Sequence, residues 1–222
     1  MFLIEQIIIC VVFAIALIAN LIAEARDSDV GKYYTKPLLI PLILVFYLIM
    51  SRETEAFIVM ALSFALMGDI FLLFQQNNTA FRLGVLSFFI SHLCWVSFII
   101  TSLDFALMEA NHILWPILPA VIPAVVSLII LWKYLVNLRL LGILYMLVTS
   151  TLLYFCLLRF GYVSNLKAWH ALAGCAFFLV SDFMIVWNRF KKEFKFAGVY
   201  IMLTYVIAIF FLVIGFMEPI NK

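Results

Sequence analysis

The chain has few charged residues and no polar segment long enough to form a separate soluble domain. Only 12% of its 222 residues are charged, whereas 68% are hydrophobic and the mean hydropathy is +1.21. Soluble domains are about 45–50% apolar by a similar count. The net charge of +2 is too small to indicate a nucleic-acid partner. We therefore expect an integral membrane protein whose main partner is the lipid bilayer.

The sequence also lacks the motifs of several enzyme classes. It contains no glycine-rich phosphate loop, no Gly-x-Ser-x-Gly, no His-Glu-x-x-His and no Cys-x-x-Cys. Nucleotide-driven pumps, serine hydrolases and zinc proteases therefore have no support. Four cysteines lie inside apolar runs without metal-ligand spacing, which predicts buried free thiols and no metal site: Cys10, Cys94, Cys156 and Cys175.

Apolar runs of about 20 residues, the length that crosses a bilayer as a helix, recur along the chain. They cover approximately 2–23, 36–51, 55–75, 82–101, 113–134, 139–158, 167–187 and 196–216. Lipid-exposed backbone must satisfy its own hydrogen bonds, and these runs are apolar on every face. This pattern predicts an all-α, polytopic membrane bundle of about eight transmembrane helices that forms a single domain, 1–222. The first run lacks a cleavage site and is expected to be a retained helix.

Prolines mark two of these runs. The second begins with Lys36-Pro37, and proline suits the first turn of a helix. The fifth carries Pro116, Pro119 and Pro123 near its start, which predicts a bent or broken helix.

Basic residues gather in alternate links between the runs, which predicts the orientation. One side is expected to be cytoplasmic, because ten basic residues lie there against four on the other side, with both termini outside. The ten are Arg26, Lys32, Lys36, Arg82, Lys133, Arg139, Arg189, Lys191, Lys192 and Lys195; the four are Arg52, Arg159, Lys167 and Lys222.

Two aspartates lie inside apolar runs, each directly after a small residue. Asp69 follows Gly68 in the third run, and Asp182 follows Ser181 in the seventh. A charged side chain within a membrane costs roughly 2.5–3.5 kcal/mol on insertion scales, so such residues usually have a function. In the predicted orientation both lie about a turn and a half from the cytoplasmic end, at the level where Lys36 opens the second run.

A short internal repeat pairs the two aspartates. Residues 65–74 resemble residues 178–187, with an offset of 113 between Asp69 and Asp182. This predicts two parallel four-helix halves, 1–110 and 111–222, related by an axis along the membrane normal. The third and seventh helices would then face each other.

Two carboxyl groups at one depth in a low dielectric cannot both ionise at low cost, so the pair is expected to share one proton near neutral pH. It would supply an acid and a base together, as in the hydrolysis of acetal-like bonds. The structural alternative is that each aspartate accepts hydrogen bonds from a neighbouring helix or pairs with Lys36. His92, within the fourth run, is either a proton relay or a polar anchor between helices.

Ordered motifs over roughly residues 36–210 resemble the YhhN-type lysoplasmalogenase family. They are Lys36-Pro37, Ser63 to Asp69, Phe81-x-x-Gly84, Ser91-His92-x-x-Trp95, Ala176 to Asp182, Asn188-Arg189-Phe190 and Tyr205-x-x-Ala208. The resemblance implies an eight-helix membrane enzyme, without a cofactor, that hydrolyses the vinyl ether bond of lysoplasmalogens. We expect Asp69 and Asp182 to be catalytic, and the substrate to contact Lys36, Arg82, His92, Ser181, Asn188 and Tyr205.

The expected location is the plasma (inner) membrane of a bacterium, with the site opening toward the cytoplasmic leaflet and a lysophospholipid as substrate. Two other classes stay open. Paired intramembrane acids, a repeat and a proline-broken helix also suit a proton-coupled transporter. A lipid-binding protein without enzymatic activity is the third interpretation. Headgroup preference and oligomeric state do not follow from the sequence.

Overall fold

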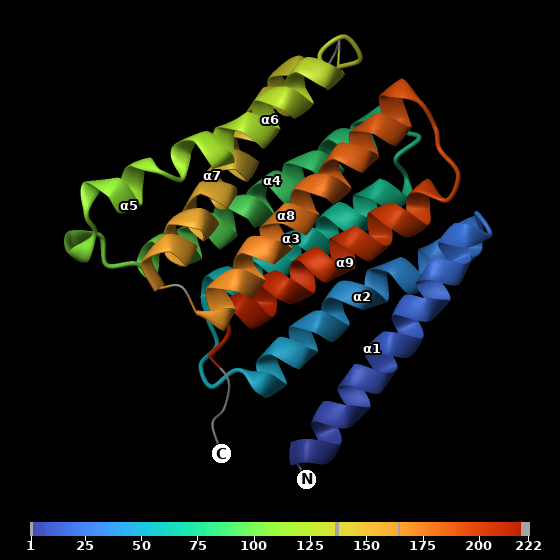
Figure 1. Ribbon diagram of the computed structural model, residues 1–222. Helices are drawn as coiled ribbons and strands as arrows, with labels where there is room; N and C mark the ends of the chain where they lie inside the picture. Colours follow the sequence, from blue (N-terminus) through green and yellow to red (C-terminus); the bar gives the residue numbers. More distant parts are fainter. Residues whose placement is uncertain (1, 136–137, 164, 219–222) are drawn as a thin grey trace.

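The computed structural model describes residues 2–135, 138–163 and 165–218, and within these residues the secondary structure is helical without strands (Figure 1). Eight helical spans in this part of the chain are long and apolar enough to cross a membrane. Seven are α1 (Phe2–Ala25), α2 (Asp29–Met50), α3 (Ala56–Leu73), α4 (Asn78–Thr101), α7 (Arg139–Val163), α8 (Leu166–Val186) and α9 (Ala197–Phe216). The remaining span combines α5 (Ala110–Leu114) with α6 (Ile117–Leu131). The prediction of an all-α bundle with eight spans is confirmed.

The start of α2 differs from its prediction. The helix begins at Asp29, where the Ser28 side chain caps it by accepting a hydrogen bond from the Gly31 N–H at 3.2 Å. Lys36 and Pro37 therefore lie about two turns inside the helix, and the prediction of a helix start there is wrong. The hydropathy pattern missed these turns because polar and charged residues fill residues 31–36.

The fifth span is broken, as its prolines predict. Trp115 and Pro116 separate the short α5 from α6, and Pro123 lies inside α6. At the end of α8 the chain forms a turn of π-helix, η2 (Trp187–Lys191), before it reaches α9.

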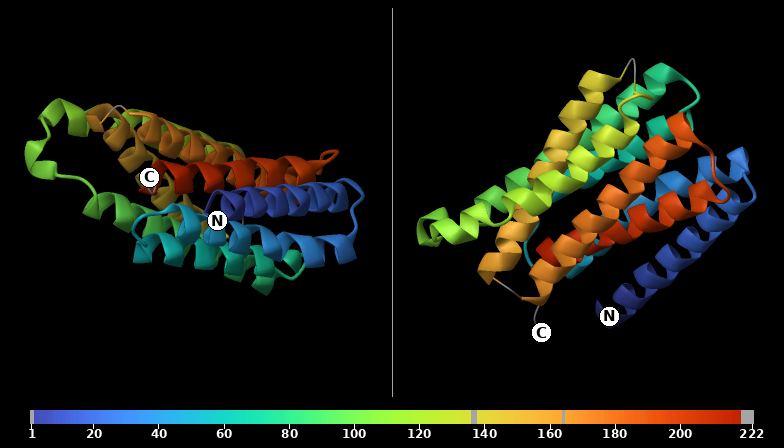
Figure 2. Two further views of the ribbon diagram at one scale, coloured as in Figure 1. Left: turned by 90° about the horizontal axis from the view of Figure 1, so that it is seen from below. Right: turned by 45° about the horizontal axis from the view of Figure 1, so that its top comes forward.

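The spans run roughly alongside one another (Figures 1 and 2). The turns 26–28, 74–77 and 192–196 lie together at one end of the bundle, which we call the turn end. The start of α1 and the end of α9 lie at the opposite end. The turn end is the end that the distribution of basic residues predicts to be cytoplasmic. Helix α1 lies at one edge of the bundle, against α2, and α6 lies at the other edge, against α7.

The core lies between α2, α3, α4, α7, α8 and α9, and small residues allow some of these helices to pack closely. The hydroxyl of Ser91 on α4 donates to the Ala61 carbonyl of α3 at 2.8 Å. Three of the four cysteines are buried free thiols, as expected: Cys94, Cys156 and Cys175. Cys10 is also free but lies exposed on α1, so the expectation that it is buried is wrong. Among the described residues no helix packs on that face of α1, and it would contact lipid.

Candidate functional site

Asp69 lies on α3, one turn before the helix ends, and three helices meet at its carboxyl group. The Tyr205 hydroxyl on α9 donates to Oδ2 of Asp69 at 2.9 Å. The Lys36 Nζ on α2 lies 3.8 Å from Oδ1. The side chain of Asp69 is only 2% exposed. Gly68 precedes it because the Phe88 ring of α4 packs there: an added Cβ would lie 2.7 Å from the ring.

Asp182 occupies a similar position on α8, one turn before Val186, and is 8% exposed. The Tyr145 hydroxyl on α7 donates to Oδ2 of Asp182 at 2.9 Å. The neighbouring Ser181 hydroxyl donates to the Ile201 carbonyl of α9 at 3.1 Å, which ties α8 to α9 beside the carboxyl group. Among the described residues no cation lies within 4 Å of Asp182.

A set of rings joins the two aspartate–tyrosine pairs. The ring centroid of Phe178 lies 5.7 Å from Tyr205 and 4.5 Å from His92. The His92 ring in turn lies 5.4 Å from the Tyr145 ring. We call this set the aromatic cluster, and its members are Phe88, His92, Tyr145, Phe178 and Tyr205. Within the described residues each aspartate is bonded to its own tyrosine rather than to the other aspartate.

His92 is fully buried in this cluster, and one of its two ring nitrogens is paired. Nδ1 lies 2.7 Å from the Phe88 carbonyl, so we assign the ring hydrogen to Nδ1. Nε2 is then an acceptor, and it has no hydrogen-bond partner among the described residues. Leaving a buried polar atom unpaired costs about 1–3 kcal/mol, so Nε2 is an acceptor that remains available inside the cluster.

Two cavities flank the site. A polar cavity of about 630 Å³ opens at the turn end, and its wall includes Glu24, Lys32, Lys36, Asn188 and Glu193. An apolar pocket of about 60 Å³ lies between α4, α6, α7 and α8, and Tyr145 and Asp182 form part of its wall. Leu72, less than one turn from Asp69, lines both cavities. The site therefore has a polar and an apolar approach on either side of Leu72.

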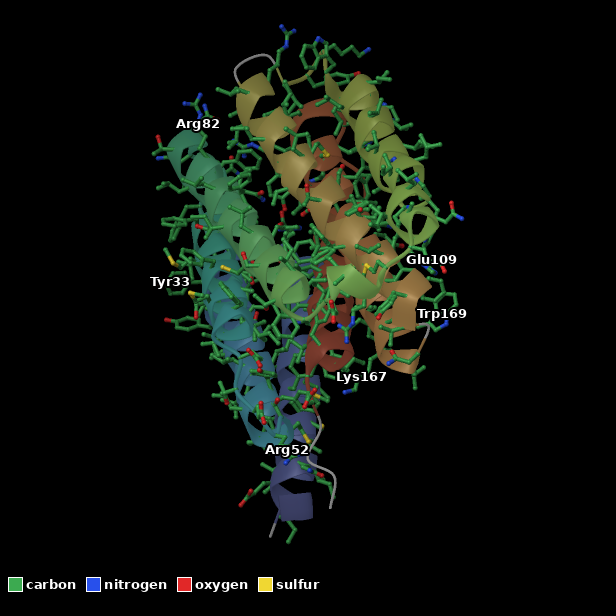
Figure 3. All side chains as sticks on the ribbon, turned by 90° about the vertical axis from the view of Figure 1, so that its left-hand side faces the viewer. Tyr33, Arg52, Arg82, Glu109, Lys167 and Trp169 are labelled. Atoms are coloured by element: carbon green, nitrogen blue, oxygen red, sulfur yellow. The ribbon has the colours of Figure 1, made fainter. Side chains whose placement is uncertain are left out.

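Other predicted site residues lie at the turn end. The Asn188 Oδ1 accepts a hydrogen bond from the Phe194 N–H at 3.2 Å, at the edge of the polar cavity. Arg82 is exposed on the outer side of α4 (Figure 3). The structure thus brings Lys36, His92, Ser181, Asn188 and Tyr205 to the site or its cavity, and leaves Arg82 outside it.

Arg189, one of the ten basic residues expected on the cytoplasmic side, joins two turns of the chain. Its guanidinium group donates to the Gln75 carbonyl and, at 3.0 Å, to the Asn78 Oδ1. It also stacks on Phe81, 4.2 Å from the ring centroid. This contact fixes η2 against the α3–α4 turn, and so holds the mouth of the polar cavity.

Sequence reasoning missed two residues of this region, Tyr145 and Glu24. Tyr145 lies within the apolar run 139–158 without a polar neighbour, so only its mid-helix position could have drawn attention to it. Glu24 directly follows the first apolar run, 2–23, and belongs to none of the motifs. Within residues 2–135, 138–163 and 165–218 no three His, Cys, Asp or Glu side chains form a group that could hold a metal ion.

Comparison with known proteins identifies the family. The model of the YhhN family matches residues 31–216, which is most of the chain. The match includes both aspartates and both of their tyrosines, and it leaves α1 outside. No curated protein and no solved structure matches the chain.

Proposed function

The chain belongs to the YhhN family, the family of lysoplasmalogenases, and we propose that it hydrolyses the vinyl ether bond of lysoplasmalogens. The products would be a fatty aldehyde and glycerophosphoethanolamine or glycerophosphocholine. Membership of the family points to a membrane hydrolase. The observation that carries the specific reaction is the pair of buried aspartate–tyrosine hydrogen bonds, which the aromatic cluster joins. A polar cavity lies beside them, and Lys36 and Leu72 form part of its wall.

Hydrolysis of a vinyl ether needs an acid that protonates the double bond and a base that accepts a proton from the attacking water. An acid protonates the carbon distal to the ether oxygen, which gives an oxocarbenium ion. Water attacks this cation and loses a proton to a base, and the hemiacetal then collapses to aldehyde and alcohol. A carboxylic acid can deliver the first proton, and a carboxylate can stabilise the cation and accept the proton from water.

The two aspartates have environments that suit these two roles. We assign the carboxylate role to Asp69, because the Lys36 Nζ lies 3.8 Å away and favours a charged partner. We assign the acid role to Asp182, which lines the apolar pocket, where an ionised group would be costly. The tyrosine hydroxyls hold both carboxyl groups in position.

The two cavities suit the two ends of a lysolipid. Ligand sites are typically about 300–1,000 Å³, and the polar cavity, at about 630 Å³, falls within this range. The glycerophosphate headgroup would occupy it, with its phosphate toward Lys36. The alkenyl chain would begin near the apolar pocket beside Asp182. The vinyl ether bond would then lie between the two carboxyl groups, near Leu72.

Other residues have supporting roles in this proposal. His92, with its unpaired Nε2 and its ring 5.4 Å from the Tyr145 ring, would exchange a proton on the Asp182 side of the aromatic cluster. Ser181 and Asn188 would hold α8 and its π-helical turn in place rather than react. A headgroup contact by Arg82 stays a prediction. We further propose that the turn end faces the cytoplasm.

One observation favours a proton-coupled transporter as the second candidate. The break between α5 and α6 leaves α6 at the edge of the bundle, against the apolar pocket, where it could move. A transporter would bind its substrate and release it unchanged.

The deciding experiment measures aldehyde release from a lysoplasmalogen by the purified protein. We expect turnover by the native protein and none by Asp69→Asn or Asp182→Asn. Asp104→Asn is the matched control, because Asp104 caps a short helix on the opposite end and asparagine caps equally well. Near-normal turnover in either well-folded aspartate variant would exclude the two-carboxylate mechanism. Uptake without aldehyde release would favour the transporter, and binding alone would favour a lipid-binding protein.

A further inference from the structure

The polar cavity carries more acidic than basic side chains, although the proposed substrate has a phosphate. Its wall includes four carboxylates and two ammonium groups: Glu24, Asp27, Asp29, Glu193, Lys32 and Lys36. A ligand with negative charge alone would be repelled by this surface. A zwitterion could place its anionic and its cationic group beside opposite charges.

The two lysines leave part of the acidic surface uncompensated. Lys32 pairs with Asp27 at 2.6 Å and with Asp29 at 3.2 Å. This contact holds the pKa of Asp27 below its usual range. Lys36 is directed to Asp69. Among the described residues, no cation lies within 4 Å of the carboxyl group of Glu24.

Glu24 is held at the cavity by the packing of α1 against α9. Its carboxyl group lies directly over Gly198 in the first turn of α9, where the Cβ of any larger residue would overlap Oε2 of Glu24. The side chain is half-buried, and it shares the cavity wall with Lys36. Aromatic rings of Tyr33, Phe74 and Phe196 also line the cavity, and ring faces attract organic cations.

We propose that Glu24 binds the ammonium end of the substrate headgroup, while the phosphate faces Lys36. This inference rests on the proposed function and makes Glu24 a specificity-determining residue of the same site. An ethanolamine ammonium would donate hydrogen bonds to the Glu24 carboxylate. Glu24 lies on α1, outside residues 31–216 matched by the family, so this selection would be a property added to the family core.

The test compares two substrates that differ only in the amine. One is the ethanolamine lysoplasmalogen, and the other is the corresponding alkenyl glycerophosphate, which has the phosphate but no ammonium group. We expect Glu24→Gln to lower the ratio of their kcat/KM values about tenfold, mainly through KM for the ethanolamine substrate. An unchanged ratio would overturn the proposal. An equal loss on both substrates would also overturn it, since Glu24 would then act by positioning Lys36 or by packing α1 rather than by contacting the ammonium group.

Two further variants separate binding from structure. Gly198→Ala should reproduce the lower ratio, because the new methyl group displaces the flexible Glu24 side chain rather than the backbone. Glu5→Gln removes the same charge from the opposite end of α1 and should leave the ratio unchanged. A native ratio in Gly198→Ala would count against the assigned position of the carboxylate.

A binding measurement separates this proposal from the proposed function. Lysophosphatidylethanolamine and lysophosphatidic acid lack the vinyl ether bond, and their affinities can be measured without turnover. We expect Glu24→Gln to weaken only the ethanolamine lipid, by about tenfold. If the native protein releases no aldehyde but Glu24→Gln weakens binding of the ethanolamine lipid alone, the proposed hydrolysis is rejected and the headgroup contact is supported. Aldehyde release without selective weakening would reject the contact and keep the hydrolase.

Discussion

A tyrosine beside each buried aspartate determines which carboxyl oxygen remains available. In Asp69 the Tyr205 hydroxyl occupies Oδ2, and Oδ1 faces Lys36. In Asp182 the Tyr145 hydroxyl occupies Oδ2, and within the described residues Oδ1 has no hydrogen-bond partner. In the proposed mechanism, the Oδ1 atom of Asp182 would carry the proton to the substrate.

Removal of either hydroxyl should impair the site without unfolding the protein. We expect Tyr205→Phe and Tyr145→Phe each to lower kcat roughly 10- to 100-fold, because a misplaced or unpaired carboxyl group costs about 1–3 kcal/mol. Aldehyde release and thermal unfolding should be measured together. Tyr154→Phe is the control on the same helix as Tyr145, since its hydroxyl bonds a distant backbone carbonyl, that of Ile113. Native kinetics in both variants would mean that the tyrosines do not position the acids.

Lys36 has two interpretations, a phosphate contact and a partner of Asp69. Both are compatible with a side chain that lines the polar cavity and lies 3.8 Å from the carboxylate. Lys36→Met should raise KM more than it lowers kcat if the phosphate contact dominates. A shifted pH optimum with a lower kcat would instead indicate the partner of Asp69. Kinetics identical to those of the native protein, measured across pH, would remove Lys36 from the site.

The sequence predicted the acids of this site better than their partners. Asp69 and Asp182 stand out because charge is rare in membrane-spanning runs, which is a local property of the sequence. Tyr205 was found only through its motif, and Tyr145 was missed. The contact between Tyr205 and Asp69 joins residues 136 positions apart, and the packing of helices decides it.

At the scale of helices, the contact between α8 and α9 depends on glycine. A Cβ at Gly174 would lie 2.8 Å from the Ala208 carbonyl oxygen, and one at Gly215 would lie 2.6 Å from the Ala171 nitrogen. Both obstacles are backbone atoms, which cannot move aside alone. This close approach also places Ser181 within reach of the Ile201 carbonyl and holds Tyr205 opposite Asp69.

We therefore expect Gly215→Ala and Gly174→Ala to force the two helices apart. Each should lower the free energy of unfolding by about 1–3 kcal/mol, as overpacking does, and should reduce turnover because Tyr205 moves from Asp69. Gly142→Ala is the matched control: its Cβ would meet only the end of the Leu135 side chain, at 3.1 Å. Thermal unfolding in detergent can rank the three variants. Equal stability of all three would contradict the close backbone contact.

Helix boundaries show where hydropathy succeeds and where it fails. The break of the fifth span followed from Pro116, whose effect on the backbone is local. The start of α2 was placed seven residues late because its first turns are polar, although Ser28 is a good cap. The error matters for the role of Lys36. At a helix start, Lys36 would bind an anion together with the free backbone N–H groups of the first turn. Inside α2 these groups are not available, and Lys36 lies beside Asp69 instead.

At the scale of the whole molecule, the pairing of the acids does not follow the predicted repeat. Asp69 on α3 receives its hydroxyl from α9, whereas Asp182 on α8 receives its hydroxyl from the preceding helix, α7. Two equivalent halves would use equivalent helices. The division into halves 1–110 and 111–222 stays a prediction. The two aspartates differ in their surroundings, as the proposed acid and base roles require.

The orientation in the membrane can be tested from both ends of the bundle. Eight spans place both ends of the chain on one side, and the basic residues predict that this side is external. A reporter fused after Lys222, which lies outside the described residues, should therefore read as external. Glu53→Cys should react with an impermeant thiol reagent in intact cells, whereas Gln76→Cys, in the turn end, should react only after lysis; the three other native cysteines are buried. Cys10→Ser removes the exposed native thiol from both variants. Reaction of the Gln76 variant in intact cells would show that the turn end faces outward, opposite to the prediction. The polar cavity would then take its substrate from the outer leaflet.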